Sequence, residues 1–336
     1  MPGRFVVRPA TPHDAAALHA LVVDSAGALE RFEDTLEAAA AAIEHSVRSL
    51  REEIEQTYLL LLEDVASRQV IGCVGLACRI GLDQPFYDYR VGKIVHSSRP
   101  LGSYRCLDVL YLCNDLTGCS EAHSLYVRRD FQGQGATAQL LKAVQLFIAG
   151  RPAAFAPRII AELRGATNDE GISPFWESIG RHFFRVDQRS AEKLVAKGRK
   201  AFIAELMPKH PVYVSLLPEA AQQAVGGVHR HLGRLTPLLE ADGFRFESHV
   251  DIFDGGRVME ARTHELAGVV GSRLVTAQTG EPGAAAGDWW LASGDGAAFR
   301  LFAARGRLDG EHWITDAATL ARLDLGDGAS VRVLAA

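Results

Sequence analysis

The spacing of apolar and polar residues changes at one stretch near the middle of the chain. From His123 to Val127 the two kinds alternate, with Leu125 and Val127 on one side, which predicts a half-buried strand. Beyond a polar turn, apolar residues recur at steps of three and four and so mark one face of a helix. That face comprises Leu140, Leu141, Val144, Phe147 and Ile148. The stretch therefore predicts a strand, a turn and a helix.

The turn combines two arginines with two glycines. Arg128 and Arg129 follow the strand, and Gly133 and Gly135 precede the helix. Glycine permits backbone angles and close approaches that a side chain would block. The backbone N–H groups and the dipole at a helix start attract an anion. The turn therefore indicates a phosphate-binding site.

Three kinds of phosphate-binding turn can be compared with this one. A P-loop has Lys and then Ser or Thr where this chain has Ala136-Thr137, and a Rossmann turn has a third glycine where Ala138 stands. Gln132-Gly133-Gln134-Gly135-Ala136 instead resembles the acyl-CoA pyrophosphate loop Q/R-x-x-G-x-G/A of the Gcn5-related N-acyltransferases (GNAT). That resemblance implies a CoA thioester as the ligand.

The rest of the chain predicts a mixed sheet flanked by helices, an α+β fold. Strands are expected at 58–63, 70–77, 107–113, 158–163, 182–186 and 244–253, and helices from Thr11 and over 25–55, 173–180, 190–200, 218–226 and 235–243. From about Thr263 short apolar runs, Val269-Val270 among them, alternate with glycine turns, which predicts a small β-barrel-like subdomain with a helix at 315–323. We expect domains at 1–200, 201–262 and 263–336. The close of the second resembles the end of an acyltransferase domain, as in a degenerate second half.

Composition excludes several classes of protein. The 336 residues carry 36 Lys and Arg against 41 Asp and Glu, a net charge of −5, which argues against nucleic-acid or membrane-surface binding. The five cysteines show no C-x-x-C pair and indicate reduced core thiols. No apolar leader or membrane-spanning stretch is apparent. We expect a cytoplasmic protein.

Several long strings are similar to the arginine N-succinyltransferase family, in that family's order from Phe5 to about Gly256. They are 85–92 (P-F-Y-D-Y-R-V-G), 95–98 (V-H-S-S), 112–118 (L-C-N-D-L-T-G), 160–165 (I-A-E-L-R-G), 173–176 (S-P-F-W), 202–211 (F-I-A-E-L-M-P-K-H-P) and 250–256 (V-D-I-F-D-G-G). Such a resemblance implies transfer of succinyl from succinyl-CoA to the α-amine of arginine or ornithine, in arginine catabolism, by direct attack. It also implies a homo- or hetero-oligomer with a related subunit.

The resemblance also assigns roles to residues. The family's proposed proton donor falls on His229, which would otherwise read as a loop histidine, and its succinyl-CoA contact falls on Leu125. A histidine titrates near neutral pH and can move the protons of this reaction. The expected acyl-CoA contacts are Leu125, Val127, Arg128, Arg129, Gln132, Gly133, Gln134, Gly135 and Ala136.

The acceptor and the succinyl carboxylate need partners of opposite charge. Asn114, Asp115 and Glu121 are candidates for the cationic acceptor, and Arg90 and Arg164 for the carboxylate. Asp169 is a further carboxylate of this kind. The pair His229 and His231 is a weak metal signal without a nearby Cys or acidic ligand set, and no metal is expected.

Two stretches depart from the family pattern. Residues 25–33 lack the family's glycine-rich segment with its threonine pair and proline, and residues 120–126 read S-E-A-H-S-L-Y in place of S-E-L-C-S/T-L-F. An altered acceptor pocket follows if the first segment shapes it. The alternative function is therefore a non-catalytic acyl-CoA-binding subunit or sensor that supports an active partner chain.

Overall fold

A computed structural model describes residues 3–29, 31–52, 56–168, 170–184, 186–188, 190–191 and 206–336. The chain forms two compact units that are interleaved in sequence. Unit 1 comprises residues 1–78, 122–157 and 263–336, and unit 2 comprises residues 79–121 and 158–262. The end of unit 2 coincides with the expected boundary at 262, whereas the boundary at 200 lies outside the described residues. The three-domain division stays a prediction.

Unit 1 begins with a strand that ends in a helix cap. After β1 (Phe5–Pro9), Thr11 and Asp14 form a capping box with Pro12 at the first helical position, and α1 (Ala15–Asp24) follows. α2 (Leu36–Glu52), β2 (Thr57–Asp64) and β3 (Gln69–Ala77) complete this part. The helix expected over 25–55 thus begins only at Leu36, because residues 25–29 and 31–35 are not helical but form turns and bends. Leu18, Leu21, Leu29 and Ile43 pack on Leu59 and Leu61.

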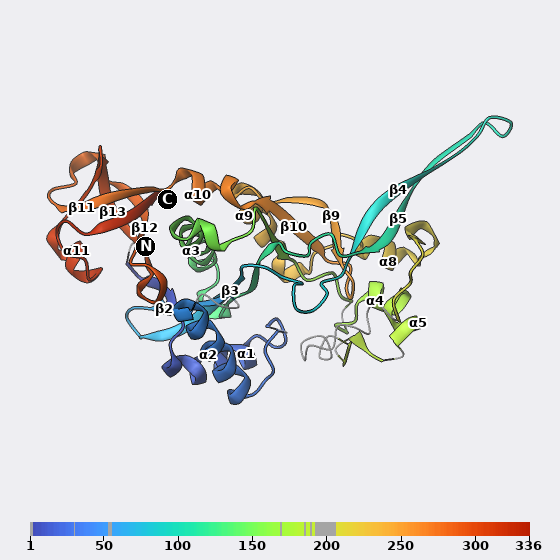
Figure 1. The fold of residues 1–336 in the computed structure, drawn as a ribbon, viewed down its shortest axis with the longest axis horizontal. Helices are drawn as coiled ribbons and strands as arrows, with labels where there is room; N and C mark the ends of the chain where they lie inside the picture. Colours follow the sequence, from blue (N-terminus) through green and yellow to red (C-terminus); the bar gives the residue numbers. More distant parts are fainter. Residues whose placement is uncertain are drawn as a thin grey trace. The chain divides into compact units, whose positions relative to one another are not determined.

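The strands near the C-terminus close into a five-stranded barrel, as the glycine-separated runs predicted. They are β11 (Arg273–Thr279), β12 (Gly287–Ser293), β13 (Arg300–Asp309), β14 (His312–Thr315) and β15 (Ser330–Ala335). Their order is β12-β15-β11-β14-β13, and a β12–β13 pairing closes the ring. Trp313 fills the interior with Leu291 and Val331, and α11 (Ala317–Arg322) packs beside it (Figure 1).

The barrel joins the N-terminal strands of unit 1 in one sheet. β13 pairs antiparallel with β1, and the order continues β1-β2-β3-β6, where β6 is Ser120–Val127. Helix α3 (Ala136–Gly150) contributes the buried side chains predicted from its spacing. Residues 267–271 form α10 (Ala267–Gly271), so the strand expected at Val269-Val270 is wrong.

Unit 2 is built on a six-stranded sheet in the order β7-β10-β9-β4-β5-β8. The strands are β4 (Asp88–Ser98), β5 (Ser103–Cys113), β7 (Arg158–Glu162), β8 (Val212–Tyr213), β9 (Arg245–Asp251) and β10 (Arg257–Arg262). Its helices are α4 (Pro174–Ser178), α5 (Gly180–Phe184), α8 (Glu219–Ala224) and α9 (Leu235–Ala241). Tyr89, Phe175 and Trp176 form the centre of its core.

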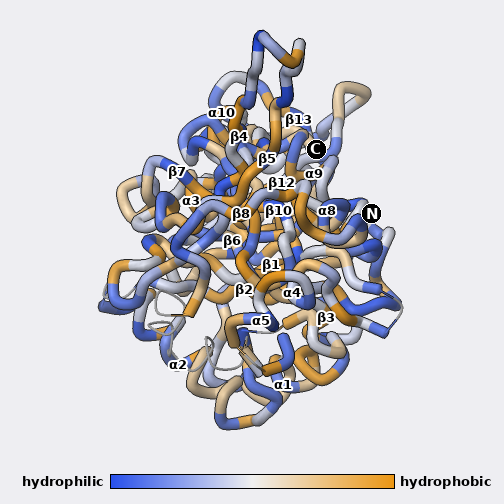
Figure 2. Tube along the Cα trace, turned by 90° about the vertical axis from the view of Figure 1, so that its right-hand side faces the viewer, coloured by the Kyte–Doolittle hydropathy of each residue, from blue (hydrophilic) through white to orange (hydrophobic). Residues whose placement is uncertain are grey.

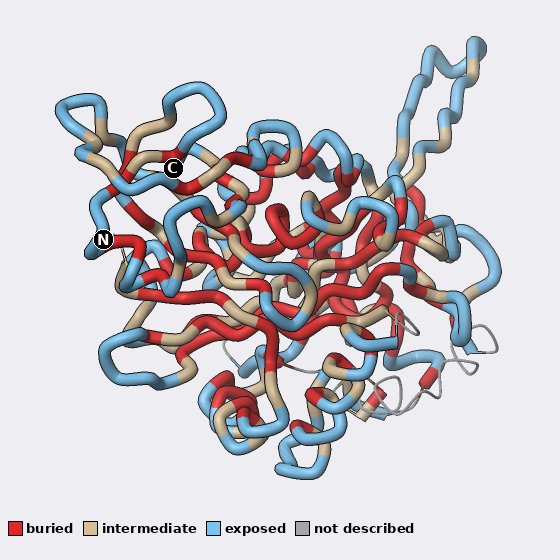
Figure 3. Tube along the Cα trace, turned by 60° about the vertical axis from the view of Figure 1, so that its left-hand side comes forward, coloured by how far each residue is buried: buried red, intermediate tan, exposed pale blue. Residues whose placement is uncertain are grey.

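Strands β4 and β5 extend from unit 2 as a long two-stranded arm (Figure 1). The outer half of the arm is exposed (Figure 3). Hydrophilic segments along its tip are interrupted by a hydrophobic one (Figure 2), and Leu101 and Tyr104 are 81% and 70% exposed. Apolar and polar residues alternate along a strand when one of its faces is buried. The outer half of the arm has no buried face, and its sequence therefore shows little alternation.

Three further predictions can be compared with the fold. Ser173 caps α4 through its hydroxyl, which accepts the N–H of Trp176 at 3.2 Å, as expected. The strand expected at 182–186 is wrong, because residues 182–184 belong to α5, and Phe184 stacks on Trp176. The helix expected over 190–200 falls almost entirely outside the described residues. All five cysteines are free thiols, in agreement with the sequence.

Within the described residues, no helix combines the length and the apolar character that a membrane crossing requires.

Candidate active site

The predicted phosphate turn lies on the surface of unit 1, between β6 and α3. Gln132 closes it by donating from Nε2 to the Val127 carbonyl at 3.0 Å, and Gln134 donates to the Asp130 carbonyl at 2.6 Å. Gly133 and Gly135 have φ of +77° and +85°, a left-handed backbone that favours glycine. The turn therefore needs glycine at positions 133 and 135, because other residues adopt this left-handed backbone only with strain.

Residues 132–135 are exposed, and Ala136 is buried at the first position of α3. The first N–H groups of a helix have no acceptor within it, so α3 directs donors toward this exposed turn. Helix α3 is fixed on the sheet by Gln139, which donates from Nε2 to the Phe5 carbonyl at 3.0 Å and lies 3.3 Å from the Leu301 carbonyl. The turn thus presents a rigid, accessible group of N–H donors, with Arg128 partly exposed and Arg129 exposed beside it.

The strand before the turn is irregular next to Leu125. Ser124 has φ of +52°, which is uncommon for a residue other than glycine and marks a local break in β6. The Cys73 thiol donates to the Ser124 carbonyl at 3.4 Å. Leu125 is partly buried and Val127 is buried. Leu125, the expected CoA contact, is therefore the residue that directly follows this irregularity in β6.

His123 is a residue that sequence reasoning did not single out as functional. Its imidazole lies where a side chain of Gly75 would stand, because a Cβ added there would be 2.1 Å from Cε1 of His123. Nδ1 lies 3.0 Å from the Ser124 hydroxyl. Burial, with the charge of Arg31 from the altered 25–33 segment, lowers the pKa of His123 well below its usual value. His123 is therefore neutral at pH 7. Arg31 and His123, one from each segment that departs from the family pattern, both belong to unit 1.

The predicted catalytic histidine lies in unit 2, in a loop that bonds to the segment at Arg164 and Gly165. Asp254 holds that segment in place. The His229 backbone N–H donates to the Arg164 carbonyl at 2.8 Å. The next residue, Gly165, donates its N–H to Oδ2 of Asp254 at 2.6 Å, and Gly256 donates to Oδ1 at 2.8 Å. A Cβ on Gly165 would lie 2.4 Å from the Asp254 carbonyl. Two predicted residues, His229 and Arg164, are thus brought together.

The protonation of His229 follows from its surroundings. Burial lowers the pKa of its imidazole, and the positive charges of Arg164, His231 and Arg230 lower it further. Its Nδ1 accepts a long hydrogen bond of 3.4 Å from the His231 N–H. The neutral imidazole therefore predominates at pH 7, which suits a group that first accepts a proton.

A second set of polar residues shares one face of the unit 2 sheet. Asp88 lies directly opposite Asp251 on the neighbouring strand. Ile160 lies opposite Glu121 on one side and opposite Glu260 on the other. Side chains that lie opposite one another on neighbouring strands project from the same face of the sheet. The Asp88 carboxyl is fully buried, and neither oxygen has a hydrogen-bond partner among the described residues. Burial and the charge of Glu162 raise its pKa well above the usual range. Such a face favours a cation.

Asp115 lies at the edge of this face. It is exposed and forms an ion pair with the exposed Arg90 at 3.3 Å. Arg158 donates to the Asp115 carbonyl at 2.7 Å and pairs with Glu260 at 3.3 Å. Asn114 is exposed in the same turn, whose Thr117 N–H donates to the Asn114 carbonyl at 3.0 Å.

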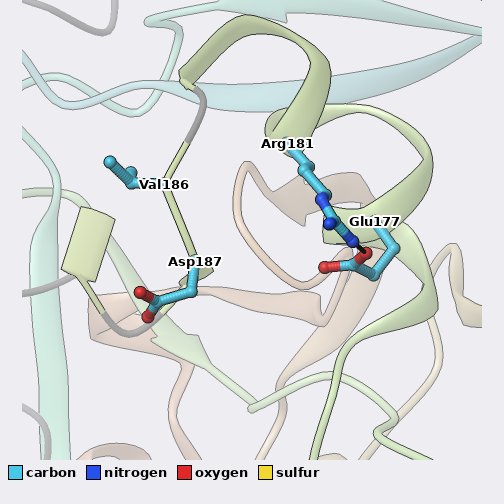
Figure 4. A pocket seen from close by; sticks show the side chains of 4 residues that line it. All are labelled: Glu177, Arg181, Val186 and Asp187. Carbon is cyan, nitrogen blue, oxygen red and sulfur yellow. Dashed lines mark hydrogen bonds and ion pairs between the residues drawn. The ribbon is translucent and has the colours of Figure 1, made fainter.

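Unit 1 therefore contains all the expected acyl-CoA contacts, and unit 2 contains Arg90, Asn114, Asp115, Glu121, Arg164 and His229. Asp169 lies outside the described residues. A surface hollow elsewhere in unit 2 is lined by Glu177, Arg181, Val186 and Asp187, with Arg181 paired to Glu177 (Figure 4). None of the sequence-predicted site residues lines that hollow.

Comparison with known proteins gives concordant matches. Residues 5–268 match the arginine N-succinyltransferase beta subunit family. Arginine N-succinyltransferase of Escherichia coli O139:H28 (strain E24377A / ETEC) is 36% identical over 336 residues, covering 98% of this chain and 97% of the relative. The Shigella flexneri enzyme of that name gives the same values. The solved structure of arginine/ornithine succinyltransferase subunit AI from Pseudomonas aeruginosa has a TM-score of 0.87 and 33% identity, covering 99% of this chain and 98% of that one.

Proposed function

The chain belongs to the arginine N-succinyltransferase family, and we propose that it transfers the succinyl group of succinyl-CoA to the α-amino group of arginine. It is an acyl-CoA-dependent N-acyltransferase. The observation that carries the proposal is the exposed turn at residues 132–135, at the N-terminus of α3. Its N–H donors and the adjacent arginines suit the diphosphate of CoA.

The reaction requires proton transfer at three steps. The α-ammonium of the acceptor loses a proton before it attacks, and neutral His229 can take that proton. The free amine then adds to the thioester carbonyl, the nitrogen of the tetrahedral adduct loses its second proton to solvent, and collapse of the adduct breaks the carbon–sulfur bond. The departing thiolate receives the proton from the imidazolium. Direct attack leaves no acyl group on the enzyme.

The acceptor is assigned to the carboxylate-bearing face of unit 2. A guanidinium is a permanent cation that forms paired hydrogen bonds with carboxylates. Glu121 and Asp88 are buried on that face, and Asp115 lies at its edge. A guanidinium would hold these buried carboxyl groups in their charged form, and their presence supports a basic amino acid as the acceptor.

Arg164 is the better partner for the free carboxylate of succinyl. It is only partly exposed, and its backbone carbonyl holds His229, whereas Arg90 is exposed. We expect Arg164→Met to lower kcat/KM for succinyl-CoA by about 10–100-fold, in line with loss of a charge-assisted hydrogen bond of about 1.5–3 kcal/mol. Steady-state kinetics with acetyl-CoA, which lacks the carboxylate, is the comparison. An equal loss with both thioesters would remove Arg164 from acyl recognition.

The glycines of the turn give a second prediction. Gly135→Val should raise KM for succinyl-CoA about tenfold or more, because a side chain obstructs the approach of the diphosphate and a left-handed backbone disfavours valine. Gly328→Val is the matched control, since Gly328 has φ of +83° and no atom within 4 Å of an added Cβ, as at Gly135. If Gly328→Val raised KM to a similar extent, the rise in Gly135→Val would be due to backbone strain alone.

A thiol-release assay tests the function as a whole. Succinyl-CoA is supplied with arginine, ornithine, lysine and a neutral amino acid, and free CoA is measured. Release that depends on arginine or ornithine is the expected result. Tight CoA binding without acceptor-dependent release would instead favour the non-catalytic subunit or sensor, the alternative that the altered segment 25–33 suggested. Mixing with a related active chain would then reveal a supporting role.

A further inference from the structure

Three side chains with metal-binding atoms converge at the end of β5 in unit 2. Cys113 is the last residue of β5, Asp115 follows in the next turn, and His249 lies on β9. The Cys113 sulfur, an Asp115 carboxylate oxygen and an imidazole nitrogen of His249 all lie within 4.8 Å of one another. Thiolate, imidazole and carboxylate together are a ligand set that zinc prefers.

The imidazole of His249 is held in an orientation typical of a metal ligand. Its Nδ1 lies 2.6 Å from Oε1 of Glu260, and Oε2 of Glu260 lies 3.3 Å from Arg158. Metal-binding histidines commonly donate their second ring N–H to a carboxylate, which fixes the ring and the tautomer. Glu260 is buried and fits this role.

The other ring nitrogen has no hydrogen-bond partner. His249 is only 6% exposed, and its Nε2 forms no hydrogen bond to any described residue. Nε2 faces Oδ2 of Asp115 at 3.8 Å. Burial lowers the pKa of His249, but the neighbouring Cys113 and Glu260 outweigh it and raise that pKa to about 9, so the resting imidazole carries a proton on Nε2 as well. A divalent cation bound at Nε2 takes the place of that proton between the imidazole, the carboxylate and the thiol.

We propose that Cys113, Asp115 and His249 bind one Zn²⁺-like divalent cation, with Glu260 orienting His249 and a fourth position left for water or another ligand. Metal–donor bonds of about 2.0–2.3 Å place tetrahedral donors roughly 3.5 Å apart. Asp115 supplies the necessary movement because it is exposed and its ion pair with Arg90 is a weak surface contact. On binding, the Cys113 thiol releases its proton to solvent.

This site is separate from the histidine pair 229 and 231 and departs from the expectation of a metal-free protein. It lies beside the buried carboxylates: Asp88 pairs directly with Cys113 across the strands. A divalent cation would neutralise part of the negative charge there. The site shares Asp115 with the proposed acceptor face, but its test measures metal binding alone and does not depend on acyl transfer.

Cobalt titration of the untagged, reduced full-length protein tests the proposal. Co²⁺ reports on its ligands, because a cobalt–thiolate bond gives a near-ultraviolet charge-transfer band that oxygen and nitrogen ligands do not give. We expect one Co²⁺ per chain with this band, and displacement by Zn²⁺. Cys113→Ser should abolish the band, and Glu260→Gln should keep it while weakening affinity about 10–100-fold, the usual effect of losing an outer carboxylate.

Cys106→Ser is the matched control, because Cys106 is an exposed cysteine on the same strand. It should bind Co²⁺ like the parent protein. Circular dichroism establishes that each variant is folded, and Glu260→Gln tests the same site without removing a ligand. The proposal is overturned if the parent shows no thiolate band, if Cys113→Ser retains it, or if Cys106→Ser loses it.

Discussion

Replacing His229 with alanine is expected to lower kcat by about 10²–10⁴-fold, the usual range for loss of a general acid–base group. The dissociation constant for CoA should stay unchanged, because the expected CoA contacts belong to unit 1 and His229 to unit 2. Stopped reactions analysed for free thiol give kcat, and calorimetry gives the CoA affinity. An unchanged kcat would remove His229 from the mechanism.

The pH profile separates a proton-transfer role from a structural one. Because the pKa of His229 is lowered from 6.5, the neutral base is present at pH 7, and kcat/KM should fall only as pH drops through a value below 6.5. Arg164→Met removes one of the positive charges that lower this pKa. The acidic limb should therefore move to higher pH in that variant.

His231→Ala is the control for His229. His231 has its ring centroid 5.1 Å from that of His229, yet no proton-transfer role falls on it. We expect this variant to retain most of its turnover. The acidic limb of its pH profile should move slightly to higher pH, because His229 loses a neighbouring positive charge that lowers its pKa. Equal loss of kcat in both variants would indicate that the loop is merely disrupted.

The second large effect is expected for Asp254→Ala, through folding stability. The Asp254 side chain is buried and accepts N–H groups from Gly165 and Gly256 on two separate segments. Its removal leaves both donors without an acceptor, and each buried unsatisfied group costs about 1–3 kcal/mol. We expect the free energy of unfolding to fall by about 2–5 kcal/mol, measured by urea titration.

Two variants sharpen this test. Asp83→Ala removes an exposed carboxylate from the same unit and should change stability by less than about 0.5 kcal/mol. Asp254→Asn keeps one acceptor but directs an NH₂ group at the other donor, so it should be intermediate or worse. Turnover should fall in Asp254→Ala under folding conditions, because Gly165 adjoins the Arg164 carbonyl that holds His229. A stability equal to that of the parent would refute the anchoring role.

The sequence predicted those parts of the fold that depend on neighbouring residues. The strand, turn and helix around Gly133 follow from side-chain spacing and glycine geometry, which are local properties. The cap at Thr11 and the capping hydroxyl of Ser173 follow from the same kind of rule. The C-terminal barrel was predictable because glycine turns separate its short apolar runs.

Other features depend on contacts between distant residues. A strand was expected at 182–186, but Phe184 stacks on Trp176 from a helix, so packing decided the outcome. The arm of β4 and β5 has little apolar pattern because its outer half has no core to face. The neighbourhood of Cys113, His249 and Glu260 requires the sheet order, which brings β5 and β9 to either side of β4. The GNAT-like second half and the site roles remain predictions.

The pairing of β1 with β13 sets an order of events during synthesis. Every residue of unit 2 has been translated once Arg262 is added, whereas unit 1 still lacks the strand that borders Val6 and Val7. The nascent polypeptide must therefore carry its first strand with an open edge until residues 301–302 leave the ribosome. Unit 2 can mature on the ribosome, and unit 1 is completed only after residues 273–335, which form its last five strands, have been translated.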